Sequence, residues 1–507
     1  MSKNYYVEPV IIKNSEIEPP STANGMWENR HIAYFMYKQP GVPECSIVVT
    51  GYNRLNKTQY CVECVLKYTI DVDFELILVD NGSTDETYDY FQSVPYDKKK
   101  IIKVEKNLGA SFPFQFIKNI FSGKYLVFLP NDVYVTKSWL SNLLRCMKSD
   151  PKIGMAMPCS SNVSNLQEVY LEYSDFNEMQ EKAAVFNQSS PMKWEERMRL
   201  ISIINLFSRE VMDTVGILDP AFVHDFMEDD YSVRMRRAGY KLMLCKDTFI
   251  CHDHDFRNLE NKTSEAFNQS LESGRAIYLE KYHGIDAWND INNFEFNLLS
   301  LFENAEMKSN DIKALTVDVK CGTPVLEIRN RLKQENITGV KSYAFTTDAK
   351  YYTDLQTVAH DTQCDRIEYI REHYAPGSFD LVLLGNPINT YVSPTSVLCS
   401  LMELLTHEGI LLFKLHNIND VKALLNNIGM DEKREFNHIV NISVNEMNNM
   451  LVKLDCADMR LGCEKNAYSQ ADLKIIEDML IRIKGNCSTD DVNRLTIRDY
   501  LYYIKKK

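Results

Sequence analysis

Polar side chains suited to ligand chemistry form three groups in the first third of the 507-residue chain. The groups are Thr50–Arg54, Asp80–Asp85 and Pro130–Val133, and each follows a short apolar run. A carboxylate such as Asp80 can accept hydrogen bonds from a base or ribose. A carboxylate such as Asp132 can hold Mg²⁺ or Mn²⁺ against a diphosphate. The three groups therefore predict a site for a small phosphorylated ligand and a divalent cation.

Two further groups lie later in the chain. Glu228-Asp229-Asp230 offers three adjacent carboxylates, and Cys251–His254 contains two histidines. A carboxylate within about 2.6–3.2 Å of a hydroxyl can act as a general base, and imidazole is a common metal ligand. Taken singly, each group has a structural alternative, because acids stabilise a helix start and Ser, Thr and Asp are favoured helix caps. The fixed order of the groups along the chain favours a shared functional site.

The elements that must position these groups follow a β/α pattern. Strand-like apolar runs alternate with helical patterns over 46–50, 56–69, 75–79, 84–93, 101–104, 111–122 and 125–129. This alternation predicts a parallel sheet with helices on both faces, and ligands of such sheets bind beyond the carboxyl ends of the strands. A helix over 228–238 and two short strands, 241–245 and 248–251, would carry the later groups. The polar stretch 160–200 is a candidate acceptor-binding loop.

These motifs resemble those of the inverting family 2 glycosyltransferases, which have the GT-A fold. The matching segments, in chain order, are Ile47–Arg54, Asp80–Asp85, Asn107-Leu108-Gly109, Leu129–Asp132, Glu228–Tyr240 and Cys251–His254. The resemblance covers about residues 45–255. One departure is Pro130, which stands where many members have the first acid of the metal motif. The resemblance implies an inverting transferase that moves a sugar from a nucleotide diphosphate to an acceptor hydroxyl.

The resemblance also assigns roles to individual residues. It implies Mn²⁺ or Mg²⁺ bound by Asp132 and His252, the latter favoured over His254 by its distance from Gly239-Tyr240. Counting back from the same pair places Glu228 at the catalytic base and Asp230 at the second acid, whereas Asp229 would be the base only if one residue were deleted. The residues expected to contact the donor, with UDP-N-acetylglucosamine preferred and a dTDP-sugar next, are Thr50, Tyr52, Asn53, Arg54, Asp80, Asn107 and Asn131.

The second half resembles a class I methyltransferase fold. The segments that carry the resemblance are Leu315–Pro324, Ser378–Leu384 and Leu404–Phe413. Two glycine positions that let the cofactor approach the backbone hold Lys320 and Pro324, and an apolar residue, Phe345, stands where a ribose-binding acid is expected. We therefore expect a methyltransferase-like domain without S-adenosylmethionine. The chain is expected to comprise an extension (1–40), a GT-A domain (41–256), a helical connector (257–310) and the methyltransferase-like domain (311–507).

Composition narrows the classes of function. The net charge of −13 and the absence of a dense basic block argue against a nucleic-acid partner. The sequence contains no run of about 18 apolar residues, so no membrane span is expected, and the start lacks the apolar stretch of a signal peptide. Thirteen scattered cysteines are typical of a reducing cytoplasm.

Three hypotheses for the whole protein follow from these patterns. The preferred one is a cytoplasmic glycosyltransferase of bacterial surface-glycan synthesis or of protein O-glycosylation, such as that of flagellin, with a glycan or protein acceptor. The first alternative is a bifunctional glycosyltransferase and S-adenosylmethionine-dependent methyltransferase. The second is a non-catalytic scaffold built from two enzyme-like domains.

Overall fold

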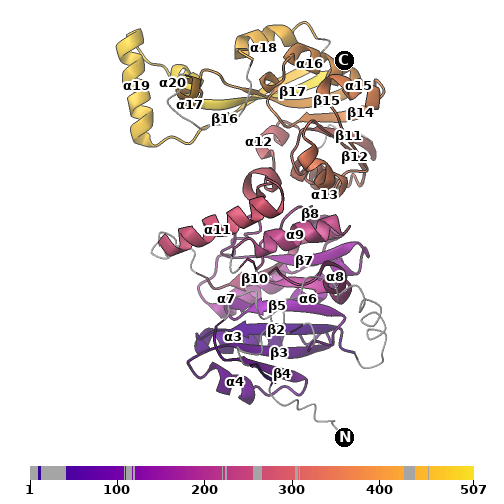
Figure 1. Cartoon of the computed structure of the whole chain (residues 1–507), viewed down its shortest axis with the longest axis vertical. Helices are drawn as coiled ribbons and strands as arrows, with labels where there is room; N and C mark the ends of the chain where they lie inside the picture. Colours follow the sequence, from indigo (N-terminus) through magenta and orange to yellow (C-terminus); the bar gives the residue numbers. More distant parts are fainter. Residues whose placement is uncertain are drawn as a thin grey trace. The chain divides into compact units, whose positions relative to one another are not determined.

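The computed structural model describes residues 10–12, 42–107, 109, 117, 120–219, 221–222, 225–254, 265–302, 307, 309–427, 440–454 and 456–507. The chain forms two compact units, Met1–Asn292 and Asn293–Lys507 (Figure 1). Each unit is built on its own mixed β-sheet with helices around it. The expected α/β fold class with two successive domains is thereby confirmed. None of the described helices has the length and apolarity needed to cross a membrane.

The sheet of the first unit places the first three predicted groups at the carboxyl ends of neighbouring strands. Within the described residues its order is β1-β4-β3-β2-β5-β9-β7-β10-β6, with β8 paired to β10. Strands β1 to β5 on this path run parallel, because β4, β3, β2 and β5 pair in parallel registers. The strands are β1 Val10–Ile12, β2 Cys45–Gly51, β3 Phe74–Asn81, β4 Lys99–Val104, β5 Tyr125–Pro130, β6 Val133–Tyr134, β7 Ile153–Ser160, β8 Trp194–Arg197, β9 Asn205–Ser208 and β10 Lys241–His252.

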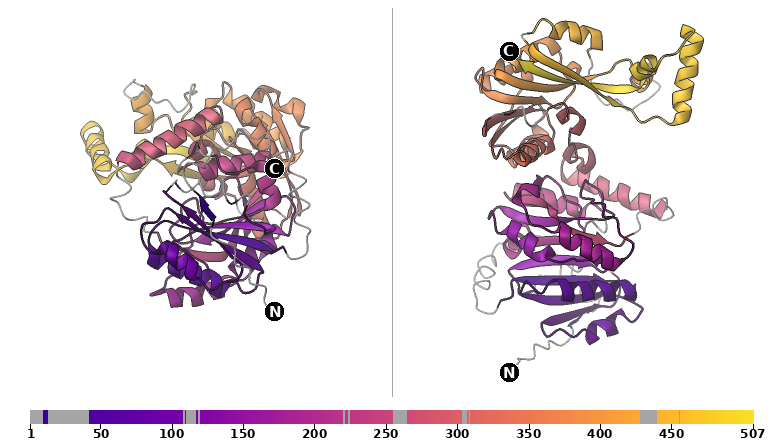
Figure 2. Two further views of the ribbon diagram at one scale, coloured as in Figure 1. Left: turned by 60° about the horizontal axis from the view of Figure 1, so that its bottom comes forward. Right: turned by 180° about the vertical axis from the view of Figure 1, so that it is seen from behind.

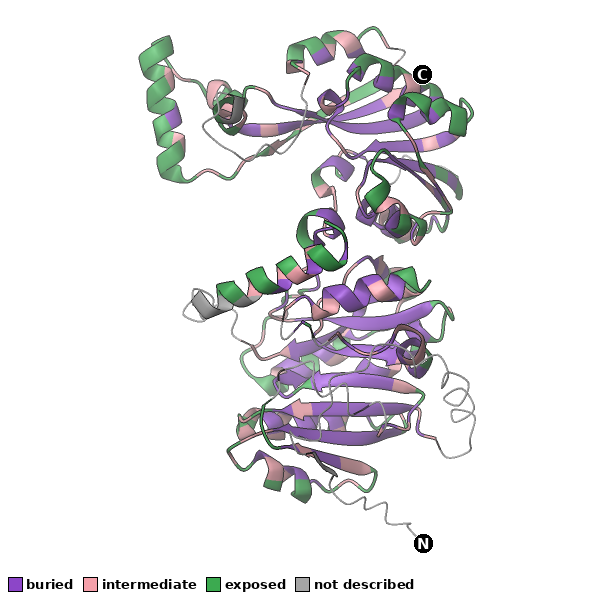
Figure 3. Ribbon diagram, in the orientation of Figure 1, coloured by how far each residue is buried: buried purple, intermediate pink, exposed green. Residues whose placement is uncertain are grey.

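Helices cover both faces of this sheet (Figure 2). The cluster on one face contains buried residues of α3, α6 and α7, and the cluster on the other contains buried residues of α8 and α9. Two-sided cover explains why β2 and β3 are almost entirely buried (Figure 3). The helices are α3 Leu55–Tyr68, α4 Thr87–Ser93, α6 Trp139–Met147, α7 Phe176–Phe186, α8 Arg209–Val215, α9 Met227–Arg237 and α11 Glu265–Lys281, with a 3₁₀ turn at Pro191–Lys193 and a π-helical turn at Ala287–Ile291.

Two expectations for this unit were wrong in detail. The sheet is mixed rather than parallel, since β9 runs antiparallel to both β5 and β7. The two strands expected over 241–245 and 248–251 form the single strand β10, which bulges where its register with β7 shifts between Cys245 and Phe249. Most of the helix expected over 111–122, and most of the extension 1–40, lie outside the described residues.

The second unit is a seven-stranded sheet in the order β13-β12-β11-β14-β15-β17-β16. The first five strands have the parallel 3-2-1-4-5 order of Rossmann-like folds, and β17 inserts antiparallel between β15 and β16. Its strands are β11 Asp311–Val317, β12 Gly339–Thr346, β13 Asp361–Cys364, β14 Phe379–Leu384, β15 Leu405–His416, β16 Cys456–Lys465 and β17 Ile497–Lys506. Its helices are α12 Phe296–Leu299, α13 Thr323–Gln334, α14 Tyr352–Gln356, α15 Ile370–His373, α16 Pro394–Leu404, α17 Val421–Asn427, α18 Val444–Leu451, α19 Gln470–Lys484 and α20 Thr489–Thr496, with short 3₁₀ turns at Ala349–Tyr351, Ile367–Tyr369 and Ile388–Thr390.

Candidate cation and donor site

The carboxyl ends of β2, β3 and β5 bring the first three groups together. Gly51 pairs with Asp80 across β2 and β3, and Thr50 pairs with Pro130 across β2 and β5. The backbone N–H of Asn131 donates to the Thr50 carbonyl over 3.1 Å. The predicted convergence of these strand ends is therefore present in the fold.

The turn after β2 is locked by side-chain hydrogen bonds. Asn53 and Arg54 both adopt left-handed backbone conformations, with φ of 55° and 59°. The Asn53 amide oxygen accepts from the N–H of Thr84 over 2.8 Å, and its carbonyl accepts from Asn131 Nδ2 over 3.0 Å. Strained conformations persist only where surrounding contacts hold them, and they concentrate at functional sites. Tyr52, at the same turn, is exposed to solvent.

Asp80, the penultimate residue of β3, has one carboxylate oxygen without a hydrogen-bond partner among the described residues. Its Oδ1 accepts the backbone N–H of Ser83 over 2.9 Å, whereas the fully buried Oδ2 has no hydrogen-bond partner among the described residues. Gly82 allows the close approach of the next turn, because a Cβ there would lie 2.5 Å from the backbone of Lys106 and Asn107. Asn107 in turn accepts from Asn81 Nδ2 over 3.2 Å. The predicted donor residues Asp80 and Asn107 thus belong to one packed turn region.

Asp132, His252 and His254 form a potential cation site. Their ligand atoms lie within 4.8 Å of one another. His252 Nε2 is 3.9 Å from Asp132 Oδ1, and His254 Nδ1 is 3.5 Å from Asp132 Oδ2. The pairing of His252 with Val133 across β10 and β6 explains this proximity. A carboxylate and two imidazoles are a donor set that fits a divalent transition-metal ion. The side chain of Arg54 approaches the same carboxylate, with its Nη1 3.4 Å from Asp132 Oδ2.

Neighbouring groups fix the orientation of these ligands. His252 Nδ1 lies 3.1 Å from the Asn162 carbonyl, which leaves Nε2 directed at Asp132. Burial lowers the pKa of His252 and so favours the neutral, metal-binding imidazole. Between the two histidines, Asp253 accepts Tyr134 OH over 2.8 Å, and Lys57 Nζ lies 2.9 Å from the same carboxylate oxygen.

The three acids at the start of α9 have different surroundings. Asp230 is fully buried, accepts Tyr282 OH over 2.6 Å and forms ion pairs with Arg234 and Lys281. Asp229 is buried in an ion pair with Arg199. Glu228 is half-buried, and its shielded Oε2 has no hydrogen-bond partner within the described ranges.

This difference affects the proton affinity of Glu228. Burial, followed by the negative charge of Asp229, raises the pKa of Glu228 to about 7. A carboxylate with such a pKa and a free oxygen has the properties of a general base that works near neutral pH.

A short loop links the cation site to the acid helix. In this loop, residues 161–168, Asn162 Nδ2 donates to the His252 carbonyl over 2.9 Å. Asn165 Nδ2 donates to the carbonyl of Arg199 over 3.1 Å, and Arg199 holds Asp229. The backbones of Asn162, Asn165 and Leu166 are all left-handed. The loop falls in the stretch expected to be an acceptor-binding loop.

Sequence reasoning missed several of these residues. It set His254 aside, although the structure brings it to Asp132; the two-residue spacing from His252 was the available signal. Lys57, Asn162 and Arg199 carried no signal, because each acts through a partner far away in the chain.

In the second unit, three residues lie in the region where the resemblance to methyltransferases places the cofactor. Lys320 adopts the left-handed conformation (φ 54°) that a glycine would take at that position. Phe345 at the end of β12 is fully buried. Asp318 after β11 accepts Tyr391 OH over 2.5 Å and the Thr347 N–H over 2.7 Å, so both of its carboxylate oxygens are engaged by the protein.

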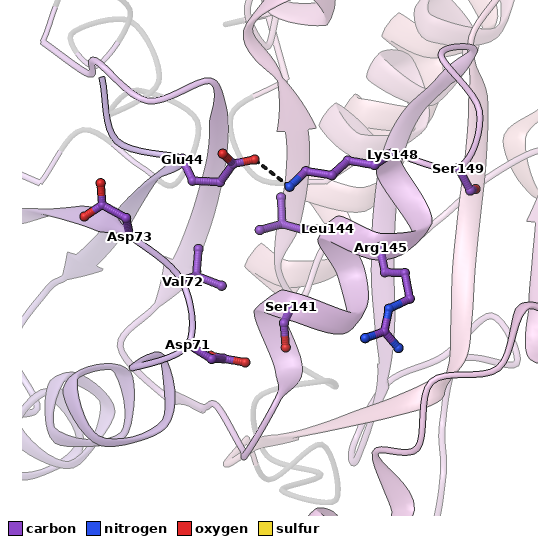
Figure 4. Close-up of a pocket in the computed structure, with 9 residues that line it drawn as sticks. All are labelled: Glu44, Asp71, Val72, Asp73, Ser141, Leu144, Arg145, Lys148 and Ser149. Atoms are coloured by element: carbon purple, nitrogen blue, oxygen red, sulfur yellow. Dashed lines mark ion pairs between the residues drawn. The ribbon is translucent and has the colours of Figure 1, made fainter. Parts of the chain in front are cut away.

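A separate surface depression of about 720 Å³ lies at the amino ends of the strands of the first sheet (Figure 4). It is lined by Glu44 and Asp73, which directly precede β2 and β3, and by Lys148 after α6. Glu44 and Lys148 form an ion pair of 2.7 Å across it. Because it adjoins the amino ends of the strands, it is distinct from the cation and donor site.

Comparisons with known proteins relate part of the first unit to glycosyltransferases. The model of the family "Glycosyl transferase family 2" matches residues 46–202. A UDP-Glc:alpha-D-GlcNAc-diphosphoundecaprenol beta-1,3-glucosyltransferase of Escherichia coli is 29% identical over 105 residues, which cover 21% of this chain and 41% of that protein. The chain therefore spans less than half the length of this curated relative.

Two solved structures are also similar. A mannosyltransferase from Pyrobaculum calidifontis, in complex with GDP-Man and Mn²⁺, is 15% identical, with a TM-score of 0.36 over 53% of this chain and 75% of that one. A SAM-dependent methyltransferase from Archaeoglobus fulgidus is 14% identical, with a TM-score of 0.30 over 46% of this chain and 99% of that one. Residues 46–202, in the first of the two α/β units, match a family 2 glycosyltransferase domain, and the second unit has the strand order of Rossmann-like folds.

Proposed function

We propose that the first unit is a metal-dependent, inverting glycosyltransferase that moves a sugar from a nucleotide diphosphate to an acceptor hydroxyl. The observation that carries the proposal is the Asp132–His252–His254 cluster, at the sheet edge of a family 2 domain where Asp80 keeps a free carboxylate oxygen. A cation bound by these three residues would neutralise the negative charge that gathers on the departing diphosphate. Two imidazoles favour Mn²⁺ over Mg²⁺, which takes oxygen ligands.

The residues of the chain have separable roles in this proposal. Asp80 and the turn of Asn53 and Arg54 bind the donor nucleotide, and the guanidinium of Arg54 contacts the diphosphate. Glu228 accepts the proton of the acceptor hydroxyl while the acceptor oxygen bonds to the anomeric carbon and the bond from that carbon to the diphosphate breaks. One base and one direct displacement invert the anomeric centre. Asp229 and Asp230 hold the base in place through Arg199, Arg234 and Lys281.

The donor we propose is a UDP-sugar. UDP-N-acetylglucosamine is the first candidate, and UDP-glucose the second because the relative from Escherichia coli is named for it. A cell-surface glycan or a protein such as flagellin is the acceptor class we propose. Thermal stabilisation by a panel of nucleotide sugars with Mn²⁺ identifies the donor, since a ligand at 100 times its Kd adds about 2.7 kcal/mol to stability.

The decisive experiment compares two variants. Glu228→Gln should lose transfer and donor hydrolysis by a factor of at least about 100, while Mn²⁺-dependent donor binding is retained. Near-normal activity of Glu228→Gln together with loss of activity in Asp229→Asn would move the base to Asp229. Retention of activity after chelation would contradict the metal-dependent mechanism.

A further inference from the structure

Exposed apolar side chains concentrate in one part of the second unit. Nine of the eighteen large hydrophobic residues exposed in the described part of the chain lie between Leu424 and Ile483. Four of them lie on α19, which stands out from the rest of the second unit at the end of the β16–β17 pair (Figure 1). Exposed apolar surface gathered in this way marks an interaction site.

Helix α19 is well formed at both ends. A capping box between Ser469 and Asp472 begins it, and Gly485 in a left-handed conformation ends it. Along one side, Leu473 and Leu480 are half-buried and Ile476 is buried, so this side packs against the unit's own residues. The helix is therefore anchored in the unit without using all of its apolar surface.

An apolar stripe that adjoins this packed side remains uncovered. Ile475, Met479 and Ile483 are 66%, 40% and 80% exposed, and their four-residue spacing places them in one stripe along the helix. Ile481 is 49% exposed but lies about 160° around the helix from Met479, outside the stripe. The stripe is thus a defined surface rather than scattered exposure.

The charges beside the stripe indicate what covers it. The first nine residues of α19 carry three acids and one lysine, whereas the last six carry two basic residues and no acid. Asp478 and Arg482 both flank the same edge of the stripe, and neither has a partner among the described residues. An antiparallel second copy of α19, with Met479 facing Met479, would bring each Arg482 beside the Asp478 of the other chain.

We propose that the chain associates with a second copy of itself through antiparallel packing of α19. The stripe supplies the apolar contact, and the reversed charge distribution of the helix sets the direction of packing. The contact is isologous, because the same residues take part on both sides.

Sedimentation velocity of the full chain from 1 to 50 µM tests the proposal. The wild type should approach the mass of two 58.8 kDa chains, whereas Ile475→Glu combined with Ile483→Glu should stay a monomer at every concentration. Ile481→Glu is the matched control and should associate as the wild type does. A wild-type monomer at 50 µM, or equal loss in the control, would overturn the proposal.

A charge exchange tests the direction of packing. Asp478→Arg and Arg482→Asp should each weaken association by at least about tenfold, and the double variant should recover it. Because both positions are on the surface, circular dichroism should show unchanged folding in all variants. Failure of the double variant to recover would exclude the antiparallel pairing.

Discussion

Substituting Glu228 by Gln should stabilise the first unit at alkaline pH while removing its activity. Below pH 4.5, Glu228 is protonated in both the folded and the unfolded chain, so its pKa shift does not affect stability there. Between pH 4.5 and about 7 the unfolded chain ionises first, since the folded pKa is the higher one, and stability falls as pH rises. Above pH 7 the destabilisation is complete, and a neutral glutamine avoids it.

The size of the effect follows from the pKa. A folded value of about 7 against an ordinary 4.5 corresponds to about 3 kcal/mol. Because Glu228 is only half-buried, solvent screening reduces the expected gain to about 1–2 kcal/mol at pH 8 and to well under 1 kcal/mol at pH 5. For a unit of this size, the gain at pH 8 corresponds to a rise in Tm of about 2–5 °C.

Differential scanning calorimetry at pH 5, 6.5 and 8 measures this difference for the first unit. Glu178→Gln is the matched control, because its hydrogen bonds with Lys182 and Ser174 lower the pKa of Glu178 to about 2. Its carboxylate stabilises the fold above the unfolded pKa, so its substitution should lower Tm at pH 8. A Glu228→Gln variant that is less stable than the wild type at pH 8, or whose gain does not depend on pH, would refute the buried-carboxylate reasoning.

Three further predictions test the site. His254→Ala should weaken Mn²⁺ binding by about tenfold or more in an electron paramagnetic resonance titration, while the exposed His407→Ala leaves it unchanged. Gly82→Ala should lower Tm and donor affinity because its Cβ meets backbone at 2.5 Å; at Gly239, where nothing lies within 4 Å, the same change should cost only about 1 kcal/mol. Asp230→Asn should destabilise the first unit by about 3–5 kcal/mol in urea unfolding, because Arg234 and Lys281 lose their buried partner.

The strands of the first half were predictable because their apolar runs are short and end at polar groups. Strand β3 was expected over 75–79 and spans Phe74–Asn81; likewise β5 was expected over 125–129 and spans Tyr125–Pro130. The antiparallel β9 escaped prediction, since a short strand inserted between β5 and β7 depends on tertiary pairing rather than on local pattern. For the same reason, two strands were expected over 241–245 and 248–251, whereas pairing with β7 on both sides of the bulge makes them the single strand β10.

The candidate site was predictable only where a motif is continuous in the chain. Asp80 and Asp132 follow directly from strand ends, and the structure places them at one sheet edge. The support of the acid helix was not predictable, because Arg199 and Lys281 lie 30 and 51 positions from their carboxylate partners. A sequence pattern can identify residues suited to bind or react, whereas the residues that orient them are determined by tertiary contacts.

The contacts of Asp230 with Tyr282 and Lys281 determine where the first unit can be shortened. A protein shortened after residue 256, at the boundary suggested by sequence, would lose both partners and leave the buried Asp230 carboxylate with Arg234 as its one remaining partner among the described residues. Proteases should not cleave the stretch from 265 to 292 in the folded protein. The C-terminal boundary of an isolated first unit should therefore lie after residue 292.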